Sequence, residues 1–240
     1  MLLSSSLPRM LLRALLPSSC ALCGAVQEAA VCRPCSLAYA DAGRPRCPCC
    51  ANPAAAGDTD RRCGACLADA PAFDATVAAC DYAAPLDGLV LGLKFNARLA
   101  LAPWMAQRLQ EAIVTSGTSL PDLLCPVPLG SRRLVERGYN QALELARPLA
   151  QRLDIPLAPR LLERVLETAA QSGVTPGERR RNVRGAFALA DGQVPLAGRH
   201  VGVVDDVMTS GHTLDELAGV LKRAGAARVT NFVFARTPPH

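Results

Sequence analysis

Two acidic side chains and a turn rich in hydroxyl groups occur together in VVDDVMTSGHT, residues 203–213. The apolar run before them predicts a strand that ends with Asp205 and Asp206, followed by a turn over residues 207–212 and a helix from about Thr213. Unpaired N–H groups and the positive end of the helix dipole make such a turn suitable for a phosphate. Because carboxylates repel phosphate, we expect the acids to contact sugar hydroxyls or a bound magnesium ion. A ribose phosphate has both parts.

Two other kinds of site also use paired acids, but this chain lacks the further residues that those sites need. A Walker B acid pair works with a P-loop of the form GxxxxGK[ST], and neither Lys94 nor Lys222 lies in such a motif. A receiver domain also needs a lysine, at a spacing that is absent here. A plain strand-to-helix turn accounts for Thr209 and Ser210 but not for the whole segment.

Nine of the eleven cysteines lie between residues 20 and 66, and eight of them form C-x-x-C pairs. A C-x-x-C pair on a tight turn directs two thiolates to one point, and two facing pairs form a tetrahedral zinc site. The sequence therefore predicts two structural zinc sites without an open coordination position. The expected ligands are Cys20, Cys23, Cys32, Cys35, Cys47, Cys50, Cys63 and Cys66.

The grouping of these ligands stays open at the level of sequence. Sequential pairing would place the four cysteines from Cys20 to Cys35 on one ion and the four from Cys47 to Cys66 on the other, whereas an interleaved pairing is also compatible with the spacing. Cys49 lies inside the third pair and could replace Cys50 as a ligand. Thioredoxin-like redox chemistry would need fewer pairs than four.

The first twenty residues bear on whether the cysteines are reduced. A disulfide framework would require export to an oxidising compartment. Arg9 and Arg13 interrupt the apolar run of this segment, and Pro8 and Pro17 break it, so it is interpreted as a short amphipathic helix rather than a signal peptide. No apolar run approaches the length of a membrane-spanning helix. We therefore expect a cytoplasmic protein with reduced thiols and no membrane insertion.

Composition and patterning bound the fold. Half of the 240 residues are apolar and 20% are charged, and the mild net charge of +5 permits an anionic partner without requiring one. After residue 70 the cysteines thin out, and helix and strand patterns alternate, which predicts a mainly parallel sheet flanked by helices with ligands at the carboxyl ends of its strands. The expected domains are 1–70, an N-terminal helix with a double zinc ribbon, and 71–240. Strands are expected over 122–129, 199–206 and 228–236, and helices over 104–113, 139–153 and 213–225.

The segment DDVMTSGHT resembles the signature of type I phosphoribosyltransferases. The rest of the chain resembles a narrower group, the competence protein F family, through PVPLGSRRLVERGYNQALELA, the R-x-x-x-T-x-x-Q spacing of Arg164, Thr168 and Gln171, RRRNVRGAF and the cysteine pairs. The resemblance covers nearly the whole chain. It implies an α/β fold of the type I phosphoribosyltransferase kind, preceded by a small cysteine-rich zinc ribbon region.

The resemblance also implies roles for particular residues. Asp205 and Asp206 would be the catalytic acids, which contact the ribose hydroxyls of phosphoribosyl pyrophosphate. The implied binding residues for the 5-phosphate are Val207, Met208, Thr209, Ser210, Gly211, His212 and Thr213. Those for the pyrophosphate are Pro128, Leu129, Gly130 and Ser131, with charge from Arg132, Arg133 and Arg137. A polar stretch, residues 168–184, would be a flap whose Gln171, Arg179 and Asn182 touch the ligand.

Two functions are compatible with these residues. One is an enzyme that binds phosphoribosyl pyrophosphate with Mg²⁺ and moves the phosphoribosyl group to or from an acceptor that the sequence does not identify. This chemistry needs leaving-group neutralisation and exclusion of water, and no nucleophilic side chain. The other is a non-catalytic sensor or adaptor whose zinc ribbons bind single-stranded DNA or a protein of the DNA-uptake machinery. The first 70 residues have few aromatic side chains for base stacking, which disfavours direct DNA binding.

Overall fold

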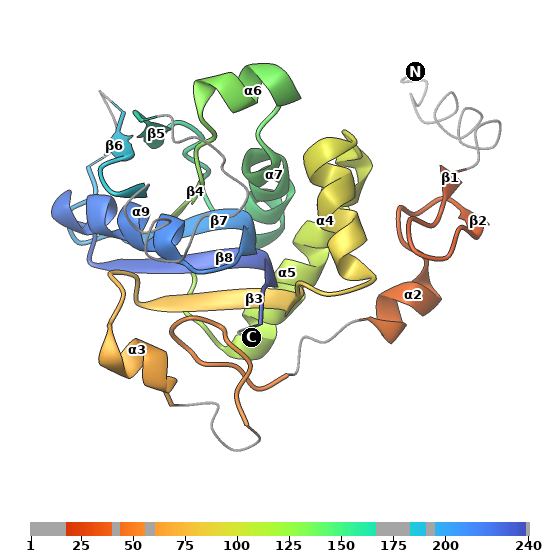
Figure 1. The fold of residues 1–240 in the computed structure, drawn as a ribbon, viewed down its shortest axis with the longest axis horizontal. Helices are drawn as coiled ribbons and strands as arrows, with labels where there is room; N and C mark the ends of the chain where they lie inside the picture. The colour runs from red at the N-terminus through yellow and green to blue at the C-terminus, as the bar shows by residue number, and fades with distance from the viewer. Residues whose placement is uncertain (1–17, 40–43, 56–60, 167–182, 191–194, 239–240) are drawn as a thin grey trace, which may run out of the picture. The chain divides into compact units, whose positions relative to one another are not determined.

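The computed structural model describes residues 18–39, 44–55, 61–166, 183–190 and 195–238, drawn as a coloured ribbon in Figure 1. The chain divides into two compact units, Met1–Ala40 and Asp41–His240. The second group of cysteines therefore shares a unit with the α/β sheet. The domain boundary expected after residue 70 stays a prediction.

The smaller unit has little apolar material to hold it together. Strand β1 (Ser18–Ser19) pairs antiparallel with β2 (Val26–Gln27), and helix α2 (Arg33–Ala38) follows. Among the described residues of this unit only Cys20, Val31 and Cys32 are buried, and α2 buries none of its side chains. A unit of this kind depends on its cysteines rather than on a hydrophobic core.

The larger unit is built on a four-stranded parallel sheet. Its strands are β3 (Ala75–Asp81), β4 (Leu123–Pro126), β7 (His200–Met208) and β8 (Arg228–Arg236), in the spatial order β3-β8-β7-β4. Strands β7 and β8 are buried almost throughout because both of their faces are covered. The observed sheet confirms the predicted fold class.

Helices cover both faces of this sheet (Figure 1). Helix α5 (Ala102–Ser116) packs on β3 and β8, and α7 (Gln141–Leu153) packs on α5, β4 and β7. Helix α9 (His212–Arg223) contacts β7 and β8 and lies on the opposite face. The three long helices and the three late strands expected from the sequence are all present; the strand over 228–236 has the expected bounds, and the boundaries of the other five are shifted.

Shorter elements complete the larger unit. They are α3 (Gly64–Ala68), α4 (Leu86–Phe95), the 3-10 helix η1 (Leu99–Leu101), α6 (Ser131–Arg137), and the antiparallel pair β5 (Leu162–Arg164) and β6 (Phe187–Leu189). The expected flap, with Gln171, Arg179 and Asn182, lies outside the described residues except for its last two positions. No helix in the described ranges is long and apolar enough to cross a membrane.

Gly202, in the middle of β7, provides a test of the packing between strands. A Cβ atom there would lie 2.5 Å from Leu124 Cδ2, 2.7 Å from Phe232 Cε2 and 2.8 Å from Pro121 Cγ. We expect Gly202→Ala to lower the free energy of unfolding by about 1–3 kcal/mol because these neighbours must shift. The measurement is the urea midpoint of the zinc-loaded protein.

Gly88→Ala in α4 is the matched control for this substitution. No atom lies within 4 Å of the Cβ position at Gly88. Alanine should stabilise this helix by roughly 0.5–1 kcal/mol, since it loses less backbone freedom on folding. A shift of the same sign in both variants would contradict the packing that the sheet shows.

Candidate functional site

The acid pair lies inside strand β7 rather than at its end. Asp205 and Asp206 are 9% and 2% exposed, and β7 continues beyond them because Val207 and Met208 pair with the last two residues of β8. This corrects the expectation that the acids are the last residues of the strand. The turn is short as a result, and α9 begins at His212.

A partly exposed lysine compensates one of the acids. Lys94, in the last turn of α4, has its Nζ 2.9 Å from Asp206 Oδ2. Gln141, the first residue of α7, donates from Nε2 to Asp206 Oδ1 at 3.5 Å. Sequence patterns bear on Lys94 only as a candidate P-loop lysine, and they do not point to Gln141. The available signal was weak: Lys94 is one of only two lysines and ends an apolar helix.

The other acid holds a proton more tightly than an ordinary aspartate. Burial, followed by the adjacent Asp206 charge, raises the pKa of Asp205 well above its usual value, while Lys94 opposes this shift. The Asp206 amide donates to Asp205 Oδ1 at 2.9 Å. The pair can therefore present one proton donor and one acceptor to a ligand such as a diol.

The turn after β7 presents backbone donors. Gly211, with a φ of 84°, is the N-cap of α9, and no side chain caps the first amides of this helix. In the described part of the chain, the amides of Ser210 and Gly211 donate to no neighbouring carbonyl. Thr209 and Ser210 are exposed, and Ser210 Oγ lies 3.2 Å from His212 Nδ1. These groups suit an anion with several oxygen atoms.

The predicted pyrophosphate turn joins β4 to α6 beside the same end of the sheet. Asn140 ties the region together, because its Nδ2 donates to Val127 O at 2.9 Å and its Oδ1 accepts from Ala142 N at 3.0 Å. Residues Pro128 to Gly130 form the turn itself, and Ser131 begins α6.

The three predicted arginines of α6 differ in their surroundings. Arg137 lies over the Phe95 ring at 5.4 Å and donates to Gln141 Oε1, which links it to the acid pair. Arg132 pairs with Glu136 on the surface. No described contact links Arg133 to the acids. The structure thus brings Arg137 to the site.

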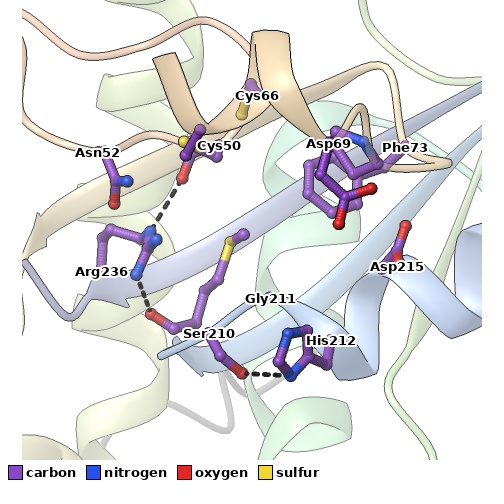
Figure 2. Close-up of a pocket in the computed structure, with 13 residues that line it drawn as sticks. Cys50, Asn52, Cys66, Asp69, Phe73, Ser210, Gly211, His212, Asp215 and Arg236 are labelled. Atoms are coloured by element: carbon purple, nitrogen blue, oxygen red, sulfur yellow. Dashed lines mark hydrogen bonds between the residues drawn. The ribbon is translucent and has the colours of Figure 1, made fainter. Parts of the chain in front are cut away.

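A cavity of about 240 Å³ separates the turn after β7 from the second group of cysteines (Figure 2). Ser210, Gly211 and His212 line one side, and Cys50 and Cys66 line the other. The other residues that line it are Asn52, Ala65, Asp69, Pro71, Phe73, Met208, Asp215 and Arg236.

The eight predicted zinc ligands form two clusters in the sequential pairing. Cluster 1 is Cys20, Cys23, Cys32 and Cys35, cluster 2 is Cys47, Cys50, Cys63 and Cys66, and the sulfur atoms of each lie within 4.8 Å of one another. The Sγ atoms of Cys23 and Cys32 are 3.7 Å apart, and those of Cys50 and Cys63 are 3.6 Å apart. A ZnS₄ tetrahedron with bonds of about 2.3 Å has edges of about 3.8 Å, so the spacing fits zinc. Cys49 is outside both clusters.

Backbone amides prepare the sulfurs for a metal. Cys32 N donates to Cys20 Sγ at 3.3 Å, and Cys63 N donates to Cys47 Sγ at 3.2 Å. Burial raises the pKa of Cys20 and of Cys47, but the N–H donors outweigh it and bring these pKa values to about 6 and about 7. Burial raises the pKa of Cys50 to about 11. Because further thiolates in a cluster need a cation, this donor set matches a structural Zn²⁺.

Comparison with known proteins gives two family models and several relatives. The Double zinc ribbon domain matches residues 11–67, and the Phosphoribosyl transferase domain matches residues 140–239. DNA utilization protein YhgH of Escherichia coli O157:H7 is 36% identical over 228 residues, which cover 92% of this chain and 98% of that protein. Competence protein F of Haemophilus influenzae is 35% identical over 180 residues, which cover 73% of this chain and 79% of that protein.

The raised pKa of Asp205 gives a pH-dependent prediction. Between the unfolded and folded pKa values the folded protein keeps a proton that the unfolded chain has lost, so stability falls as pH rises through the folded value. Asparagine cannot ionise. We therefore expect Asp205→Asn to have a higher Tm than wild type, with a gap that widens from pH 5 to pH 8 in thermal melts. A constant gap, or a less stable variant at pH 8, would contradict the shift.

Metal content tests the two clusters. We expect about two zinc ions per chain by elemental mass spectrometry, because each set of four sulfurs holds one ion. Cys20→Ser combined with Cys23→Ser should remove one ion. Cys80→Ser is the control, since Cys80 is buried in β3 outside both clusters. A zinc-free protein with unreactive thiols would instead indicate disulfides.

Proposed function

The chain belongs to the family of competence protein F and DNA utilization protein YhgH, and on that premise we propose that it binds phosphoribosyl pyrophosphate with Mg²⁺ and transfers the phosphoribosyl group to an acceptor. One feature supports this most strongly: a buried acid pair, in which the pKa of Asp205 is raised, is followed closely along β7 by an uncapped helix turn. A sugar phosphate needs both: the acids can contact its hydroxyls, and the amides of the nearby turn can contact its phosphate.

The described residues divide the work of binding. The acid pair holds the ribose, because protonated Asp205 can donate to one ribose oxygen while Asp206 accepts from a hydroxyl. The amides and hydroxyls of the turn after β7 hold the 5-phosphate. Lys94 neutralises Asp206 in the free protein and is 26% exposed, so it can also reach an anionic group of the ligand.

The reaction breaks the bond between C1 of ribose and the pyrophosphate oxygen and forms a bond from C1 to the acceptor. Positive charge develops on the sugar as the bonding electron pair leaves with pyrophosphate, and the proton that the acceptor loses passes to the pyrophosphate or to water. The protein holds the two reactants in line and keeps the ribose fixed while the leaving group departs. Arg137 and the turn before α6 are the described groups placed to receive that leaving group.

Magnesium fits the oxygen ligands that this site and its substrate supply. Mg²⁺ takes carboxylate and phosphate oxygens, and it neutralises a pyrophosphate leaving group when bound. Among the described residues, Asp205 and Asp206 of β7 are the carboxylates that would hold it. We place the reaction in the cytoplasm, where the cysteines stay reduced, and in the use of incoming DNA, as the names of the relatives suggest.

A second candidate function is an adaptor that binds single-stranded DNA or a DNA-uptake protein. It is favoured by a cavity of about 540 Å³ beside cluster 2, which is lined by four arginines, Arg44, Arg46, Arg62 and Arg228. Two of these arginines, Arg44 and Arg46, already pair with Asp81. An anionic polymer would therefore contact mainly Arg62 and Arg228.

Calorimetric titration with phosphoribosyl pyrophosphate and Mg²⁺ tests the main proposal. Wild type should bind, and the double variant Asp205→Asn, Asp206→Asn should lose at least about tenfold in affinity, since it removes the charge-assisted contacts to ribose. Asp154→Asn is the matched control, because this exposed acid ends α7 away from the strand end. Release of pyrophosphate across a panel of nucleobases and amines then tests transfer.

Three results would decide between the two functions. Binding with turnover supports the transferase. Binding without turnover across the panel favours a sensor of the same ligand. No binding of the ligand, with salt-dependent binding of oligonucleotides that Arg62→Ala and Arg228→Ala weaken, would replace the transferase by the adaptor.

A further inference from the structure

We propose that Arg236 is a positioning residue for the turn after β7, residues 209–211, which we call the phosphate turn. Through Arg236, zinc in cluster 2 sets the affinity of this turn for a phosphate group. This inference rests on the proposed function, since it concerns the same turn. It assigns to cluster 2 a role in ligand binding that cluster 1 does not have.

Arg236, the last residue of β8, is buried between the phosphate turn and cluster 2 (Figure 2). Its Nη1 donates to Met208 O at 3.1 Å, to Thr237 O at 2.6 Å and also to Thr209 O. Its Nε donates to Cys50 O at 2.9 Å. In the part of the chain that the structure describes, all hydrogen-bond partners of this guanidinium are backbone carbonyls.

These bonds fix the direction of the amides in the turn. A trans peptide is planar, so the N–H of one residue points opposite to the C=O of the residue before it. When Arg236 holds the carbonyls of Met208 and Thr209, the amides of Thr209 and Ser210 point away from it. A phosphate on that opposite side then meets donors that are already oriented.

The same arginine makes the turn depend on cluster 2. Cys50 supplies a sulfur to the cluster and its carbonyl to Arg236, so one residue joins the metal site to the guanidinium. The cysteine turn is also held by Ala51 N donating to Cys47 O at 2.9 Å and by Arg46 donating to Ala51 O at 3.1 Å. Without metal, the thiols of Cys47 and Cys50 lose the ion that holds them together, and the Cys50 carbonyl is held less firmly.

Cluster 1 offers a comparison within the same chain. Like cluster 2, it has four cysteine ligands arranged as two C-x-x-C pairs, but it lies in the other compact unit. Loss of its zinc should leave the Arg236 contacts intact. A general effect of zinc loss on the protein can thus be separated from a local effect on the turn.

The test compares Cys63→Ser with Cys32→Ser, which each remove one ligand from one cluster. Zinc content is measured by elemental mass spectrometry, and the Kd of ribose 5-phosphate by calorimetry. Each variant should lose one zinc. We expect the Kd to rise about tenfold in Cys63→Ser, as for the loss of a charge-assisted hydrogen bond, and to stay within about twofold in Cys32→Ser. Equal changes in both variants would overturn the inference.

Arg236→Met tests the arginine itself, with Arg236→Lys as the conservative variant. Arg236→Met should raise the Kd of ribose 5-phosphate about tenfold while the Kd of free pyrophosphate, which binds the turn before α6, stays within about twofold. Lysine keeps the charge but not the fork of donors, so partial recovery is expected. If the arginine were purely structural, its loss would weaken the binding of both ligands alike, and that result would refute a positioning role.

Hydrogen exchange keeps this inference separate from the proposed function. If wild type binds neither ribose 5-phosphate nor phosphoribosyl pyrophosphate, the proposed function fails. The coupling between cluster 2 and the turn is then tested by the exchange rates of the backbone amides over residues 208–211. These rates should rise in Cys63→Ser and not in Cys32→Ser. Unchanged rates in Cys63→Ser would overturn the coupling whatever the ligand.

Discussion

The larger unit depends on how two adjacent carboxylates are buried inside strand β7. An uncompensated buried charge is costly, so the neighbouring elements must bring cations and donors to this point. Lys94 does so from the end of α4 and Gln141 from the start of α7. Tyr139 OH donates to Leu93 O and so ties these two helices together next to the acids. The result is a site that exists before any ligand arrives, in which burial and then the adjacent Asp206 charge raise the pKa of Asp205. Preorganisation of this kind costs the free protein stability and benefits the bound state.

The two zinc clusters are alike in chemistry and different in context. Cluster 1 belongs to a unit with few buried residues, in which metal replaces a hydrophobic core. Three sulfurs of cluster 2, those of Cys47, Cys50 and Cys66, lie in the same buried cluster as side chains of β7 and α9. Metal in cluster 2 therefore acts on a domain that already has a core. This metal affects the local geometry of the cysteine turn. The Cys50 carbonyl, which accepts a hydrogen bond from Arg236, links that geometry to the proposed ligand site.

The sequence predicts those parts of the site that are contiguous along the chain. The C-x-x-C pairs, the acid pair and the turn are short local patterns, and the alternation of apolar runs is enough to predict a parallel sheet. Lys94, Gln141 and Arg236 act over long separations, and their local sequence gives at most a weak signal of this role. The end of β7 was misplaced for a similar reason, since its length is set by the pairing partner β8 and not by its own composition. The sequential grouping of the cysteines required the fold, because spacing alone is compatible with two arrangements.

The order of strands in the sheet has a consequence for the synthesis of the protein. Strands β3 and β4 are the first two in sequence and the two outer ones in space, while β8 and β7 lie between them. A ribosome that has made only the first 200 residues has therefore made both sides of a sheet without its middle. The apolar surfaces of α5 and α7 must wait until residue 236 has emerged before they are covered completely. During that interval the nascent chain is open to chaperones and proteases, and the ligand site is among the last features to form.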